Sequence, residues 1–95
     1  MTTYEITNKI HCFGNKEGVF IGIDPLIPVT EQGMTHGGLS LLIRAVFCRD
    51  LLNKELTLDN LYNTWKTTSN RISVKRVKKS LCDLISGGFM KEIST

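Results

Sequence analysis

The stretch ISVKRVKKSLCDLISGGF, residues 72–89, carries the strongest structural signal in this chain. Its apolar residues recur at intervals of three and four, which is typical of a helix with one buried face. Ser73 stands where an N-cap is expected, and Ile72 and Val77 have the spacing of a hydrophobic staple around it. The double glycine at residues 87–88 can supply the positive φ that ends a helix. The stretch therefore predicts one amphipathic helix from the serine cap to the double glycine.

The predicted helix has an apolar face and a cationic face. The apolar face comprises Val74, Val77, Leu81, Leu84 and Ile85. The opposite face comprises Lys75, Arg76, Lys79, Ser80 and Asp83, with Lys78 at the border. Two cations in a first turn oppose the helix macrodipole, at a cost on the order of a few tenths of a kcal/mol each. A merely solvated face would more often carry acids there, so the pattern favours a surface that meets a polyanion.

The charge of the chain is unevenly distributed. Residues 1–65 carry five basic and seven acidic side chains, whereas residues 66–95 carry seven basic and two acidic ones, a local balance of +5 within a net charge of +3. Such clustering is typical of a nucleic-acid-binding surface. A membrane surface is the weaker alternative, because the apolar face beneath the cations lacks an aromatic anchor.

Length and composition limit the other possibilities. The 95 residues suffice for one domain, and no apolar run approaches the roughly 20 residues that cross a bilayer. The N-terminus lacks the pattern of a signal peptide, so we expect a cytoplasmic protein. Cys12, Cys48 and Cys82 form no metal-ligand spacing and are expected to be small buried hydrophobes. We expect no metal, no cofactor and no enzymatic activity, because no acid pair, nucleophile–base pair or phosphate loop has supporting context.

The N-terminal third of the chain predicts strands followed by a loop. Residues 1–23 are expected to form a β-hairpin, with β-prone runs on either side of the turn GNKEG. Residues 24–38 contain two prolines and three glycines and are expected to be a loop. Residues 39–52 predict a helix that is apolar on nearly all sides. Such a helix needs cover from the hairpin or from a second copy of the protein.

The rest of the chain predicts a short helix, a polar turn and a final strand. Leucines and aromatics at helical spacing follow Thr57, a plausible N-cap, and the polar segment KTTSNR precedes the basic helix. We expect three helices within residues 39–86 and a strand within residues 88–95 that pairs with the N-terminal hairpin. The predicted fold is a single α+β domain over residues 1–95, with a small antiparallel sheet that includes this hairpin.

The helical part of the chain resembles the N-terminal winged-helix domain of phage and plasmid replication initiators and replisome organisers. That family opens its first helix with leucine and serine, as at residues 39–40, and centres a short second helix on leucine. Its third helix has the form I-S-x-x-x-V-x-x-x-L-x-x-L-x-x-x-G-F. The matching positions are Ile72, Ser73, Val77, Leu81, Leu84, Gly88 and Phe89. The segment FIGIDP, residues 20–25, resembles the preceding strand, and the resemblance covers about residues 19–92.

This resemblance implies a winged helix-turn-helix fold and a role in DNA binding. Initiators of the family continue into a second domain, whereas this sequence ends at Thr95. The closer likeness is therefore to a small phage or plasmid regulator of transcription or replication.

We expect the basic helix to enter the major groove of double-stranded DNA, with Lys75, Arg76 and Lys79 nearest the base edges. Arg76 is the best candidate for a guanine contact, because its planar fork matches the two acceptors of that base. The polar turn and neighbouring lysines are expected to contact phosphates. The full predicted interface is Lys66, Thr68, Ser69, Asn70, Arg71, Ser73, Lys75, Arg76, Lys78, Lys79 and Lys91.

Two further partners are suggested by the same features. Because one such domain makes few DNA contacts, specific binding usually needs two copies, and the apolar helix at residues 39–52 predicts a homodimer. The alternative function is a protein-interaction module on the same scaffold, a small inhibitor or adaptor whose basic face meets a host protein complex.

Overall fold

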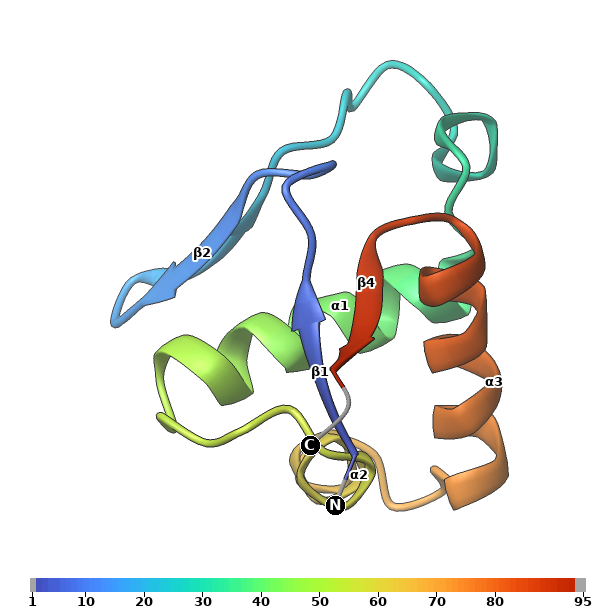
Figure 1. Cartoon of the computed structure of the whole chain (residues 1–95). Coiled ribbons are helices and arrows are strands. Elements are labelled where there is room, and N and C mark those ends of the chain that lie inside the picture. The colour runs from blue at the N-terminus through green and yellow to red at the C-terminus, as the bar shows by residue number, and fades with distance from the viewer. Residues whose placement is uncertain (1, 94–95) are drawn as a thin grey trace.

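A computed structural model describes residues 2–93 of the chain (Figure 1). The elements are β1 (Thr3–Ile6), β2 (Cys12–Asn15), β3 (Gly18–Ile21), the 3-10 helix η1 (Val29–Gln32), α1 (His36–Asp50), α2 (Leu58–Lys66), α3 (Val74–Ser86) and β4 (Met90–Ile93). Over the described residues they form an α+β fold with three α-helices and two small antiparallel sheets, β1–β4 and β2–β3. The predicted α+β class, the three helices and the presence of an N-terminal hairpin are confirmed.

The hairpin is shorter than predicted, because the first β-prone run divides into two strands. β2 pairs with β3 from Cys12↔Ile21 to Asn15↔Gly18, so the turn has two residues rather than five. Asn15 accepts a hydrogen bond from the Glu17 N–H at 2.8 Å, which closes this turn. The earlier strand, β1, leaves the hairpin and pairs elsewhere.

β1 lies between two partners that are distant in the sequence. It pairs with β4 from Thr3↔Ile93 to Ile6↔Met90, and the Tyr4 N–H donates to the Leu56 carbonyl at 2.8 Å on its other edge. The N-terminal region therefore does pair with the C-terminal strand, as the sequence predicted. It does so through β1, and the hairpin β2–β3 forms a separate sheet.

α1 begins three residues earlier than predicted, and the predicted loop before it contains η1. The Thr35 hydroxyl caps α1 by accepting from the Gly38 N–H at 2.9 Å. α2 and α3 pack on one side of α1 and the hairpin packs on the other (Figure 1). Leu41, Leu42, Ala45, Val46 and Cys48 are buried as a result. The hairpin thus supplies much of the cover that this apolar helix needs.

α3 has the two ends that the sequence predicts. The Ser73 hydroxyl accepts from the Arg76 N–H at 3.2 Å. At the other end Gly88 has φ +82°, and its N–H and that of Phe89 donate to the Ile85 and Leu84 carbonyls, which is a Schellman motif. Gly87 differs from the prediction, because its φ is −78°. A Cβ there would lie 2.9 Å from the Phe89 ring, so Gly87 is required by close packing.

Two residues of α3 differ from the prediction in whether their side chains are buried. Val74, the first residue of α3, is exposed rather than buried, because Ile72 and Val77 make the core contacts of this end of the helix. Ser80 is buried rather than exposed, because α3 approaches α1 closely where α1 carries glycines. A Cβ on Gly37 would lie 3.0 Å from the Ser80 hydroxyl oxygen, and one on Gly38 would lie 3.3 Å from Leu84.

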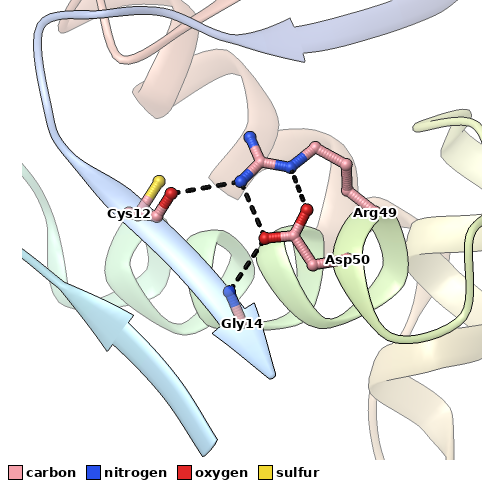
Figure 2. A network of polar contacts seen from close by, with 4 residues as sticks. All are labelled: Cys12, Gly14, Arg49 and Asp50. Carbon is pink, nitrogen blue, oxygen red and sulfur yellow. Dashed lines mark hydrogen bonds and ion pairs between the residues drawn. The ribbon is translucent and has the colours of Figure 1, made fainter. Parts of the chain in front are cut away.

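A polar network attaches the hairpin to the last turn of α1 (Figure 2). Arg49 donates to both carboxylate oxygens of Asp50, at 2.7 and 3.0 Å, and to the Cys12 carbonyl at 3.1 Å. Asp50 also accepts from the Gly14 N–H at 2.8 Å. The Arg49 guanidinium is the main reason why the pKa of Asp50 lies below its ordinary value of 3.8, and burial raises the pKa of the Cys12 thiol.

We expect Asp50→Asn to lower the free energy of unfolding by about 1 kcal/mol, because the charged hydrogen bonds of a half-buried network are weakened. The lowered pKa means that this stabilisation is present above the ordinary carboxyl pKa and is lost as the pH falls through the folded-state value. In urea unfolding at several pH values, the free energy of unfolding of the variant should therefore fall less steeply as the pH is lowered. Glu17→Gln, in the hairpin turn, is the control and should change little. An unchanged acid slope in Asp50→Asn would contradict the prediction.

Candidate nucleic-acid interface

The cations of α3 face outward. Lys75, Arg76, Lys78 and Lys79 are all exposed. The ion pairs found among residues 2–93 are Arg49–Asp50 and Lys91–Glu5, and neither involves α3. Four positive side chains on one helix are thus available to an anionic partner. Unneutralised surface charge of one sign attracts polyanions over a distance comparable to the Debye length.

Lys75, Lys79 and Cys82 follow one another at i, i+4 and i+7 and define the middle of this outward face. Arg76 and Lys78 lie at its two flanks, because they are rotated by about 80° to either side of the line through Lys75 and Lys79. Cys82 is exposed, so the expectation that all three cysteines are buried is wrong for this one. The other two differ: Cys48 is buried as expected, and the Cys12 thiol is half-buried.

A surface cavity of about 340 Å³, open to solvent, lies beside the N-terminal end of α3. Its lining residues come from α1, from the end of α2, from the α2–α3 turn and from α3. They are Arg44, Trp65, Ser69, Arg71, Ile72 and Arg76. The structure therefore brings three of the predicted site residues, Ser69, Arg71 and Arg76, to one place. It adds Arg44 and Trp65, which the sequence did not assign to the interface.

Arg44 is held in place by contacts to three segments. Its guanidinium donates to the Ser40 carbonyl at 3.2 Å and to the Thr68 hydroxyl at 3.0 Å. It also lies over the Trp65 ring, 5.2 Å from the centroid, within the range of a cation–π contact. One signal could have identified Arg44 in the sequence, because it is the single charge within the apolar run at residues 39–48.

The residues predicted to contact phosphates differ in exposure, in the partners that they already have and in where they lie. The Thr68 hydroxyl donates to the Trp65 carbonyl at 3.0 Å and accepts from Arg44, so its proton is already used within the fold. Lys66 and Asn70 are exposed beside the turn. Lys91 lies on β4, where it forms a 2.6 Å ion pair with Glu5, and it does not line the cavity. The structure thus groups the turn and α3 and leaves Lys91 on another surface.

Comparison with protein-family models, with curated proteins and with solved structures found no match for this chain. Within residues 2–93 no three His, Cys, Asp or Glu side chains form a cluster that could hold a metal ion. Among the described helices, none has both the length and the apolar character needed to cross a bilayer.

We expect Ser73→Ala to lower the free energy of unfolding by about 1 kcal/mol, because it removes the hydroxyl that caps α3. Ser73→Asp should keep most of the stability, since a carboxylate also caps a helix and favours its positive end. Ser86→Ala, which changes an exposed serine at the other end of the same helix, is the matched control. Chemical denaturation of the three variants tests this, and equal stability of Ser73→Ala and the original chain would contradict it.

Proposed function

We propose that this chain binds double-stranded DNA through α3 and the turn that precedes it. The observation that supports this most is the outward face of α3, whose four cations have no carboxylate partner among residues 2–93. The sequence of elements also fits a winged helix-turn-helix. α2, the turn and α3 would form the helix-turn-helix, while β1 and β4 would form the small sheet beside it. On the resemblance of its sequence, the chain would be a regulator of transcription or replication of phage or plasmid type.

In the proposed mode α3 lies in the major groove, with Lys75 and Lys79 directed at the base pairs. Arg76, which the sequence favours for a guanine contact, lies at the flank of the helix beside the turn. Lys66, Asn70 and Lys78 would contact phosphates on either side of the groove. The one carboxylate of α3, that of Asp83, should repel the DNA phosphates only weakly, because it is half-buried and accepts a hydrogen bond from Thr35.

We expect the variant with Lys66→Ala and Lys78→Ala, the two lysines proposed to contact phosphates, to bind a random duplex roughly tenfold more weakly at low salt than the original chain. The logarithmic salt dependence should also become shallower by about one unit for each lysine that meets a phosphate. Fluorescence anisotropy with a labelled duplex at several salt concentrations measures both quantities. Lys16→Ala is the matched control, because it removes a lysine from the hairpin turn, on the opposite side of the domain from α3 (Figure 1).

A second readout in the same experiment locates the DNA on the protein. Cys82 is exposed on the outward face of α3, and Cys48 is buried. Bound duplex should therefore slow alkylation of Cys82 by iodoacetamide, detected by peptide mass spectrometry. Lack of duplex binding by the original chain at low salt would refute the proposed function. Binding that leaves Cys82 as reactive as before would refute the assignment to α3.

We further propose that two copies bind DNA together and associate through the exposed apolar side chains of α1 and the hairpin. Ile43 and Phe47 remain about 37% and 39% exposed on α1, although the hairpin covers the neighbouring side chains. Phe13 and Phe20 stack on the hairpin with ring centroids 5.0 Å apart and are also exposed. Ile43 and Phe47 line one pocket with Val19, and Phe13 and Phe20 line the neighbouring pocket, which Val19 also borders.

We expect Phe47→Glu to shift the protein from dimer to monomer in sedimentation velocity at high micromolar concentration, because a charge would be buried at the contact. Leu26→Glu is the control, since Leu26 is 90% exposed in the loop before η1 and lies outside this region. If the original chain sediments as a monomer, the proposed dimer is wrong.

The same apolar region favours a second candidate function, a protein-interaction module that binds a host protein complex. Exposed aromatic side chains are enriched at protein interfaces. A gel shift with random duplex at low salt separates the two functions. DNA binding predicts a clear shift, whereas the interaction module predicts little or none.

A further inference from the structure

We infer that the cavity between α1, the α2–α3 turn and α3 binds one phosphate group of the DNA backbone, held by Arg44, Arg71 and Arg76. This inference rests on the proposed function, because it names the group of the DNA that this part of the surface binds. It assigns a DNA contact to Arg44, which lies outside the basic segment of the sequence. It also changes the role of Arg76 from reading a base to binding a phosphate.

The first argument is the charge of the lining. Three of the six residues that line the cavity are arginines, and none of the six is acidic. Like charges gathered in one place repel one another, so this arrangement is favoured when an anion occupies the cavity. A guanidinium presents paired N–H donors in a plane that matches two phosphate oxygens. Ser69 adds a hydroxyl that can donate to a third.

The second argument is that Arg44 is already ordered. Its contacts to the Ser40 carbonyl and the Thr68 hydroxyl use two of its five N–H donors, and the Trp65 ring supports one face of its guanidinium. The remaining donors are available to a ligand. Because the side chain is fixed before binding, little rotamer entropy is lost when the phosphate binds.

The third argument is the apolar part of the wall. Trp65 and Ile72 are buried side chains that contribute to the lining of this otherwise polar cavity. Ion pairs and charged hydrogen bonds are stronger beside such a surface than in open water. The exposed lysines in the middle of α3 lack this support, so we expect the arginine cavity to be the stronger phosphate site.

The position of Arg76 favours binding to a phosphate over the guanine contact that the sequence suggested. Arg76 lines the cavity together with Arg71, whereas Lys75 and Lys79 occupy the middle of the outward face. An arginine that binds phosphate contributes equally to every sequence of base pairs. Loss of Arg76 should therefore weaken binding to a preferred duplex and to a scrambled duplex by the same factor.

The experiment uses Trp65, the only tryptophan of the chain, as a reporter inside the cavity. Inorganic phosphate is titrated into the full chain at constant ionic strength while the emission of Trp65 is recorded, with sodium chloride as the blank. In a second arm, duplexes selected from a random pool and their scrambled versions are titrated. Both arms are repeated with Arg44→Gln, Arg71→Gln and Arg76→Gln, and with Lys16→Gln as the control.

We expect phosphate to change the Trp65 emission of the original chain, and each arginine variant to weaken both phosphate and duplex binding about tenfold. The loss should be the same for selected and scrambled duplexes. Arg44 also contacts the fold, so thermal unfolding of its variant is measured alongside. Arg71 and Arg76 are exposed, and their variants decide the question if Arg44→Gln unfolds.

Three other results would overturn the inference, and they differ in what they say about the proposed function. If duplex binding is retained but Arg76→Gln loses only the preference at one base pair, Arg76 reads a base and the DNA-binding function stands. If duplex binding is unaffected by all three variants, the cavity is not part of the interface. If inorganic phosphate binds and no duplex does, the ligand is a free phosphate compound and the proposed function fails.

Discussion

The pairing of β1 with β4 is the constraint on which the position of α3 depends. β4 follows α3 after only a short turn, and in the described residues β1 is its one strand partner. Backbone N–H and carbonyl groups at a buried edge must be hydrogen-bonded, so β4 requires this pairing. The residues just after β1 extend it, because the Thr7 N–H donates to the Phe89 carbonyl and the Lys9 ammonium lies over the Phe89 ring. The N-terminal segment thus fixes the C-terminal end of α3.

Within residues 2–93 the other end of α3 has no strand beside it and is held by the Ser73 cap and by the buried side chains of Ile72 and Val77, and this difference relates the fold to the proposed site. The C-terminal half of the helix is held by Leu84 and by the Schellman turn, while Val74 and the first-turn cations at the N-terminal end are exposed. Cations at a helix N-terminus are unfavourable for the isolated helix. They are tolerated here at the exposed end, beside a cavity that contains two more arginines. A bound anion would relieve both the repulsion between these charges and the conflict with the helix macrodipole.

Local signals in the sequence predicted the helices well and the strands less well. Ser73 and Thr57 are caps in the structure, because N-cap hydrogen bonds involve only neighbouring residues. The first β-prone run was predicted as one strand of a hairpin, but only its end pairs locally, Cys12 with Ile21. Its beginning pairs with a distant segment, Ile6 with Met90, and such a pairing has no local signal. The start of α1 was placed too late, since the glycines at its N-terminus disfavour a helix unless tertiary packing needs their small size.

The sequence alone predicts the cationic face of α3, its cap and its end, because these follow from helical periodicity and from contacts within a few residues. It also predicts that the apolar helix must be covered. Tertiary structure alone decided that β1 pairs with β4, that Ser80 is buried against Gly37, and that Arg44 joins the arginines of the turn and α3. Each of these involves residues from separate elements, and the packing of those elements against one another has no signature in local periodicity.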